Sequence, residues 1–270
     1  MNKYDVIFST LFLRNPKLNS TWIEYHSNLG VDHFYLYCLN NLITEEMLEP
    51  IKPYSDIVTI INWELPTLED PTLKYIDIAQ FNYTAAMTVS YGNIANWVGH
   101  ISPDEFLVLR KDNNIRDLIK RFNDKRYIKI KWNWAKLDGM TIDEYENFQL
   151  SYFFKYNSFI KKNQGPWGNP FSTGSDKFLY KNDLSPIHLE VHNPIELPIW
   201  DHGSLESTEY GHVDESIASL FHYKMRIDLP RKLTDKLVPW AKYDNISEDK
   251  IIIDNTIREL IKGNNNDQMV

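Results

Sequence analysis

Residues 21–39 read TWIEYHSNLGVDHFYLYCL, a stretch that predicts one helix followed directly by one buried strand. Aromatic, histidine and leucine side chains recur there at helical spacing: Trp22, Tyr25, His26 and Leu29. Thr21 and Glu24 have the spacing of a capping box, so we expect the helix to begin at Thr21 and to end at Gly30. Residues 32–39 are almost wholly apolar, as in a strand that is covered on both faces of a parallel sheet. Helix and strand in this order indicate an α/β fold.

The flanking sequence repeats this alternation. Further strands are predicted at 6–13, 57–63, 97–101 with 106–109, and 127–134. Helices are predicted at 44–51, 73–91 and 115–122, and two more in the C-terminal part at 229–240 and 248–261. Alternating strands and helices predict a mostly parallel central sheet flanked by helices, and the C-terminal part is less regular. We expect a single domain over residues 1–262 and a polar, flexible tail over 263–270.

Composition and charge exclude several classes of protein. The 270 residues include 29 Lys and Arg against 37 Asp and Glu, so the net charge of −8 is unlike that of a nucleic-acid-binding protein. The single cysteine, Cys38, excludes a disulfide framework, and its apolar neighbours predict a buried side chain. No apolar run reaches the roughly 20 residues of a membrane span, and the N-terminus lacks the pattern of a signal peptide. We therefore expect a cytoplasmic protein, with peripheral association with a membrane left open.

The segment most typical of a functional site is WVGHISPDEFL, residues 97–107, called the acidic string below. It places Asp104 and Glu105 between two apolar strand segments, at the end of a strand in an α/β sheet, where such folds bind ligands. Hard cations such as Mg²⁺ and Mn²⁺ take one or two carboxylates together with substrate phosphates. The string therefore predicts metal-assisted nucleotide binding, and the alternative from these residues alone is a solvated turn between two strands of a hairpin.

The order of several motifs resembles glycosyltransferase family 92. The Trp-Ile-Glu-Tyr-His helix and the Gly-Val-Asp-His-Phe-Tyr strand quoted above look like the opening of that family. Later segments agree in order: Lys52-Pro53-Tyr54, Gln80 with Tyr83, the 97–107 string, Ile130-Lys131-Trp132 with Gly139, Lys177-Phe178-Leu179, His192-Asn193-Pro194 and His222-Tyr223-Lys224. The resemblance covers roughly residues 4 to 240.

The resemblance implies a GT-A-type fold, the nucleotide-diphospho-sugar transferase fold, in which an Asp-x-Asp motif holds a divalent metal on the donor diphosphate. It implies a Mn²⁺ or Mg²⁺ cofactor, a nucleotide-sugar donor, and a glycan or polysaccharide acceptor. The ion would neutralise the leaving nucleoside diphosphate, and a carboxylate would deprotonate the acceptor hydroxyl if the reaction inverts.

This sequence departs from the family pattern at three acidic positions. Ser102 replaces the first Asp of Asp-x-Asp, Pro16 replaces an acid after the first strand, and Cys38 replaces one after the second. Three hypotheses follow: a metal held by Asp104 and a later histidine, a metal-independent enzyme in which Arg14, Lys177 or Lys224 takes the phosphate charge, or lost catalysis.

The resemblance assigns roles to particular residues. The predicted metal ligands are Asp104, His192 and His222. The predicted contacts to the nucleotide-sugar are Arg14, Asn15, Gln80, Tyr83, Ser102, Lys177 and Lys224. The candidate bases for the acceptor are Asp201 and Asp138, and Trp167 and Trp200 are candidates for stacking on a sugar. His26, His33 and His100 are interpreted as structural.

The first hypothesis for function is therefore a glycosyltransferase. A non-catalytic family member that binds a sugar nucleotide or glycan as a partner subunit is the second. A nucleotidyltransferase with the same kind of nucleotide site is the third.

Overall fold

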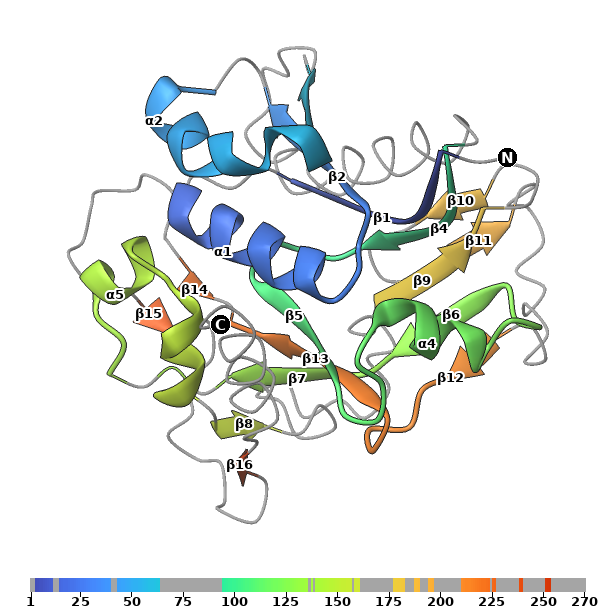
Figure 1. The fold of residues 1–270 in the computed structure, drawn as a ribbon. Helices are drawn as coiled ribbons and strands as arrows, with labels where there is room; N and C mark the ends of the chain where they lie inside the picture. Colours follow the sequence, from blue (N-terminus) through green and yellow to red (C-terminus); the bar gives the residue numbers. More distant parts are fainter. Residues whose placement is uncertain are drawn as a thin grey trace, which may run out of the picture.

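The computed structural model describes the fold over most of the N-terminal half and over shorter segments of the C-terminal half (Figure 1). The described residues are 3–11, 15–39, 43–63, 94–135, 137, 139–156, 158–160, 177–182, 187–189, 194–196, 210–223, 225–226, 238–239 and 251–253. They form two main sheets, helices beside them, and two small two-stranded sheets.

The larger sheet has seven strands in the order β12-β6-β9-β4-β1-β2-β3. These are β1 (Tyr4–Leu11), β2 (His33–Leu39), β3 (Val58–Trp63), β4 (Ala95–His100), β6 (Tyr127–Ile130), β9 (Lys177–Lys181) and β12 (Tyr210–His212). Strand β9 runs antiparallel to β4 and β6, and the other neighbouring pairs are parallel. The predicted α/β fold with a mostly parallel central sheet is confirmed.

The smaller sheet has five strands in the order β16-β8-β7-β13-β5. These are β5 (Glu105–Leu109), β7 (Trp132–Ala135), β8 (Ser158–Ile160), β13 (Ala218–His222) and β16 (Ile251–Ile253). Among the described strands, the chain passes from the larger to the smaller sheet three times, from β4 to β5, from β6 to β7, and from β12 to β13. The sequence predicted one strand over 127–134 and a continuation of β4 into 106–109, but both segments divide between the two sheets.

Helix α1 (Pro16–Asn28) packs between the two sheets, and its start differs from the prediction. The helix begins at Pro16 and not at the predicted Thr21. Asn15 caps it by accepting a 3.0 Å hydrogen bond from the Leu18 amide, and Pro16 occupies the first turn. The hydroxyl of Thr21 instead donates to the Phe148 carbonyl oxygen at 3.0 Å. Gly30 follows the helix with φ of 94°, the left-handed conformation that glycine adopts without strain, so the predicted stop is confirmed.

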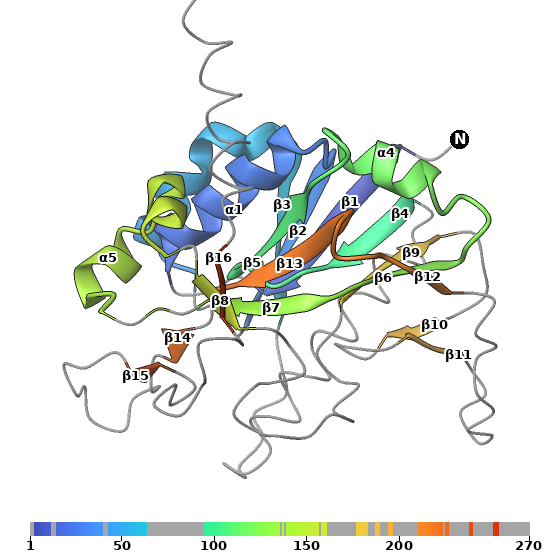
Figure 2. The ribbon, with the colours of Figure 1, turned by 90° about the horizontal axis from the view of Figure 1, so that it is seen from below.

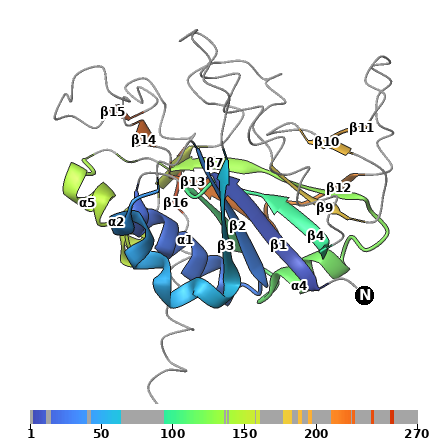
Figure 3. The same ribbon diagram turned by 90° about the horizontal axis from the view of Figure 1, so that it is seen from above.

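The other helices among the described residues are short. They are α2 (Glu45–Leu48), η1 (Glu49–Ile57), α4 (Ile115–Lys120), α5 (Ile142–Glu146) and η3 (Leu150–Phe154). Figures 2 and 3 show α1 and α4 on the same side of the seven-stranded sheet, opposite the hairpin of β10 (Ile187–Leu189) and β11 (Pro194–Glu196). No helix in the described part of the chain is long and apolar enough to cross a membrane.

Two C-terminal segments correct the sequence prediction. The helices expected over 229–240 and 248–261 contain strand residues, β15 (Val238–Pro239) paired with β14 (Met225–Arg226), and β16 paired with β8. The run of isoleucines at 251–253 satisfies the apolar positions of either element, and pairing with another strand decides between them. The predicted helix at 73–91 and the tail at 263–270 lie outside the described residues.

The main core lies where α1 meets both sheets. Trp22, Phe34 and Phe106 are fully buried there, and Cys38 is 2% exposed, as the sequence predicted. Gly99 in β4 leaves room for its neighbours, since a Cβ at this position would lie 2.7 Å from the Phe8 ring and 2.8 Å from Leu179. Close packing around β4 thus fixes the strand that leads into the acidic string.

Candidate active site

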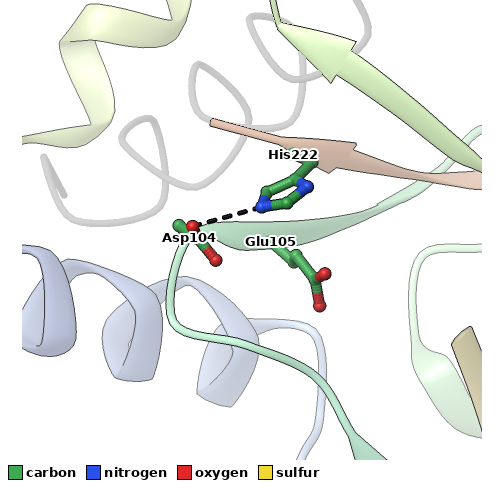
Figure 4. Close-up of side chains that lie close together, drawn as sticks. All are labelled: Asp104, Glu105 and His222. Carbon is green, nitrogen blue, oxygen red and sulfur yellow. Dashed lines mark hydrogen bonds and ion pairs between the residues drawn. The ribbon is translucent and has the colours of Figure 1, made fainter. Parts of the chain in front are cut away.

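Three ionisable side chains lie close together at the turn between β4 and β5. Asp104 ends the connecting turn, Glu105 begins β5, and His222 ends β13, directly opposite Glu105 in the antiparallel pairing. One potential ligand atom of each residue lies within 4.8 Å of the others. Figure 4 shows His222 facing the Asp104 carboxylate, while the carboxylate of Glu105 points away from that contact. The site therefore joins the adjacent Asp104 and Glu105 to a histidine at least 117 positions further along the chain, at the carboxyl end of the central strand β4.

The Asp104–His222 pair is the more accessible part of this cluster. His222 Nε2 lies 3.1 Å from Asp104 Oδ2, and the Asp104 side chain is 15% exposed. The His222 ring stacks on Trp132 with centroids 4.1 Å apart and planes 15° apart, which fixes its orientation. The Tyr223 amide donates to the Asp104 carbonyl oxygen at 2.7 Å, so β13 also holds the backbone of Asp104.

Glu105 lies in different surroundings, because its side chain is 1% exposed. Its Oε2 accepts a 2.7 Å bond from the Ser102 amide and lies 3.3 Å from the ammonium of Lys177, which is itself 2% exposed. Lys177 Nζ also lies 3.4 Å from Ser102 Oγ. A buried carboxylate needs such partners, and Lys177 supplies the opposite charge. Glu105 is thus held within the protein, whereas the carboxylate of Asp104 is the one that solvent reaches.

The donors of this cluster suit a divalent cation. Carboxylate oxygens and an imidazole nitrogen are ligands that Mn²⁺ accepts, and Mg²⁺ accepts the carboxylates. The charges of Glu105 and Lys177 offset each other within the protein, whereas the Asp104 side chain is 15% exposed and faces His222. Asp104 and His222 are therefore the side chains that would hold such a cation.

A second buried histidine, His26, lies near this cluster on the α1 side of β5. Both of its ring nitrogens contact backbone groups, Nδ1 with the Trp22 carbonyl oxygen at 2.9 Å and Nε2 with the Leu107 amide at 3.2 Å. Complete burial lowers the pKa of His26 to about 3. His26 is therefore a neutral, structural residue, as the sequence indicated.

The other two histidines that were interpreted as structural also have partners in the protein. His100 Nδ1 lies 3.3 Å from Ser9 Oγ on the neighbouring strand β1. His33 Nε2 lies 2.7 Å from Thr59 Oγ1, and partial burial lowers the pKa of His33 to about 4. Both contacts join adjacent parallel strands of the larger sheet.

The structure brings together four of the predicted site residues: Asp104, His222, Ser102 and Lys177. Asn15, predicted to contact the donor, is 5% exposed and caps α1. The remaining predicted site residues lie outside the described residues: Arg14, Gln80, Tyr83, Asp138, His192, Asp201 and Lys224, together with Trp167 and Trp200.

Two features of the site were missed by the reasoning from sequence. Trp132 lies in the core and also stacks on His222, 90 positions further along the chain. Lys177 was assigned to the donor phosphates, and its nearest ionic partner is Glu105, 72 positions earlier. Neither contact has a signal in the sequence, because each depends on which strands become neighbours.

The comparison with known families decides the relationship. The model of glycosyltransferase family 92 matches residues 18–262, most of the chain. The chain belongs to glycosyltransferase family 92. The resemblance of the helix, strand and acidic-string motifs to this family is thereby confirmed, and the match includes all the described residues of the Asp104–Glu105–His222 cluster.

Solved structures similar to this family 92 chain have low sequence identity. The mannosyltransferase Ktr4p from S. cerevisiae is 16% identical, with a TM-score of 0.30 over 48% of this chain and 39% of that chain. S. aureus TarS 1–349 is 10% identical, with a TM-score of 0.36 over 66% of this chain and 47% of that chain. The aligned part thus spans less than half the length of either structure. No curated protein matches the chain.

Proposed function

We propose that this chain is a glycosyltransferase that moves a sugar from a nucleotide-sugar donor to a glycan or polysaccharide acceptor. Membership in family 92 supports this activity. The observation that carries the proposal is the meeting of Asp104, Glu105 and His222 at the carboxyl end of β4, where an α/β sheet binds its ligands. No comparable observation supports a nucleotidyltransferase.

In the proposed site, Asp104 and His222 would hold a Mn²⁺ or Mg²⁺ ion. When bound, such an ion neutralises the negative charge that develops on the leaving nucleoside diphosphate. Trp132 keeps the imidazole of His222 in place, and the Tyr223 amide fixes the backbone of Asp104. Lys177 compensates the charge of Glu105 within the protein, and Asp104 is the more exposed of the two carboxylates.

The position of Lys177 favours the metal-dependent hypothesis over the metal-independent one. An ammonium that is 2% exposed and 3.3 Å from a carboxylate is poorly placed to take the charge of a donor diphosphate. Ser102 occupies the position of the first Asp of the family motif, and its amide and hydroxyl contact Glu105 and Lys177 instead. In this proposal, Asp104 and His222 take the place of the two acidic ligands of the family's Asp-x-Asp motif.

The rest of the proposed reaction uses residues outside the described part of the chain. Arg14, Gln80, Tyr83 and Lys224 remain proposed contacts to the donor, and His192 a further proposed metal ligand. Asp201 and Asp138 remain the proposed bases for the acceptor hydroxyl. A cytoplasmic location also remains a prediction.

The experiment combines donor binding with donor turnover. A panel of nucleotide-sugars is titrated with and without Mn²⁺ while the melting temperature and the release of nucleoside diphosphate are measured. A donor present at about 100 times its Kd should stabilise the folded state by about 2.7 kcal/mol. Asp104→Asn should weaken binding of the ion, which stabilises the transition state by several kcal/mol. The variant should therefore release nucleoside diphosphate at least about 100-fold more slowly than the wild type.

The matched control is Asp117→Asn, which removes an exposed carboxylate that pairs with Lys120 on α4. This variant should keep both the Mn²⁺-dependent stabilisation and the turnover. Binding without release in the presence of acceptor extracts would favour the partner-subunit hypothesis. If no donor binds, the proposed function is wrong, and if Asp104→Asn keeps the Mn²⁺ effect, the metal assignment is wrong.

A further inference from the structure

Strand β5, which begins with Glu105, has one edge that no described strand covers. It is the last strand in the order of the five-stranded sheet, with β13 on its inner side. The backbone N–H and C=O groups on its outer edge are buried, so they need partners other than water. Helix α1 runs along this edge (Figure 1).

Three side chains of α1 supply those partners. Trp22 Nε1 donates to the Glu105 carbonyl oxygen at 2.9 Å, and the hydroxyl of Tyr25 donates to the Leu107 carbonyl oxygen at 2.9 Å. The Leu107 amide donates to His26 Nε2 at 3.2 Å. Because His26 Nδ1 faces the Trp22 carbonyl oxygen, Nδ1 carries the ring proton and Nε2 is free to accept. Side chains of one helix thus take the place of a neighbouring strand.

The bond from Trp22 differs from the other two in its position. It fixes the carbonyl of Glu105, the residue whose side chain accepts from the Ser102 amide and faces Lys177. On the opposite edge, the Tyr223 amide fixes the carbonyl of Asp104. The backbone of these two acidic residues is therefore held from both sides, whereas Tyr25 and His26 act two residues further along β5.

We propose that Trp22 is a positioning residue for the cation site, whose indole N–H sets the orientation of the backbone from which the Asp104 and Glu105 side chains project. All the groups involved are buried, Trp22 at 0% and Glu105 at 1% exposure, so the bond is shielded from competing water. This inference rests on the proposed function, because it gives the cation site a further structural support beside Trp132, Lys177 and the Tyr223 amide.

The test compares Trp22→Phe with Tyr25→Phe. Each variant keeps an aromatic ring and removes one donor to a carbonyl oxygen of β5, but only Trp22→Phe acts at the acidic pair. Electron paramagnetic resonance measures free Mn²⁺ during titration of the whole chain in the presence of UDP or GDP. We expect Trp22→Phe to weaken Mn²⁺ binding about tenfold and Tyr25→Phe less than about twofold, even where both lower the midpoint of urea unfolding.

Equal loss of Mn²⁺ affinity in the two variants, or full affinity in Trp22→Phe, would overturn the proposal. If Trp22→Phe does not fold, benzothienylalanine placed at residue 22 removes the N–H group while keeping the shape of the indole, and the same result is expected.

A second measurement separates this inference from the proposed function. Residue-resolved hydrogen exchange of the metal-free protein reports on the Ser102 and Glu105 amides, which close the acidic turn. Trp22→Phe should speed exchange at both amides at least about tenfold relative to Tyr25→Phe. If the wild-type chain binds no Mn²⁺, the metal assignment fails, and exchange alone decides the role of Trp22. Unchanged exchange at these amides would refute it.

Discussion

The two edges of strand β5 are closed in different ways, and each edge carries a buried histidine. On the α1 edge, both nitrogens of His26 contact backbone groups, and burial lowers its pKa to about 3. On the β13 edge, His222 is 2% exposed and faces the carboxylate of Asp104. The two rings are equally buried, so burial does not distinguish a structural histidine from one suited to bind an ion. The partner of the ring makes the distinction: neutral backbone in one case and a partly exposed carboxylate in the other.

The largest effect is expected from removing the buried charge that pairs with Glu105 at the start of β5. Lys177→Met leaves the buried carboxylate of Glu105 without its cation, which should lower the free energy of unfolding by about 3–5 kcal/mol. Urea unfolding of the variant measures this loss. Glu105→Gln in the same chain should recover much of it, because no buried charge is then left unpaired.

The control for Lys177 is Lys155→Met. Lys155 pairs with Glu144 but is 55% exposed, so its removal should have little effect on unfolding. An equal loss in the two variants would mean that the Glu105–Lys177 pair is no more important than an exposed ion pair, and the contrast between the two edges would weaken.

Replacing the histidine on the β13 edge tests the proposed ion site. His222→Gln keeps a polar group near Asp104 but removes the imidazole nitrogen, so Mn²⁺ affinity should fall about 10–100-fold, or about 1.4–2.8 kcal/mol. Titration of free Mn²⁺ measures the change. His212→Gln, on the exposed face of β12, is the control and should bind Mn²⁺ like the wild type. Unaltered affinity in His222→Gln would remove this histidine from the metal ligands.

The buried His26 on the α1 edge should make the stability of the protein depend on pH. The unfolded chain protonates His26 below about pH 6.5, whereas the folded chain does so only near pH 3, so acid favours unfolding. Between pH 6.5 and 5 this difference amounts to about 2 kcal/mol from His26 alone. Urea unfolding at several pH values should show a flatter pH dependence for His26→Gln than for the wild type. Parallel curves would mean that His26 takes up a proton in the folded state as readily as in the unfolded state.

The smallest effect concerns the start of α1. Asn15→Ala removes the cap on the Leu18 amide and should lower stability by about 1 kcal/mol. Asn15→Ser keeps a capping oxygen and should unfold like the wild type. Donor titration of Asn15→Ser also tests the predicted contact between Asn15 and the nucleotide-sugar, since a weakened donor affinity in a stable variant would support it.

Much of the α1 edge could be predicted from local sequence. The spacing of Trp22, Tyr25 and His26 indicated one buried helical face, and Gly30 indicated its end. The start of the helix was placed too late, because Thr21 and Glu24 imitate a capping box inside a helix that Asn15 and Pro16 begin. What this face contacts, the backbone edge of β5, had no signal, since β5 lies about 80 residues further along the chain.

The sequence by itself determined the alternation of elements, the buried strands, the acidic string at the end of a central strand, and the resemblance to family 92. Those features depend on neighbours along the chain, where periodicity, caps and turn residues act. Only the tertiary structure decided that β4 and β5 belong to different sheets, that His222 contacts Asp104, and that Lys177 forms an ion pair with Glu105. Each of these depends on strand order and register between distant segments, and a shift of one residue in the pairing of β5 with β13 would turn Glu105 and His222 to opposite faces.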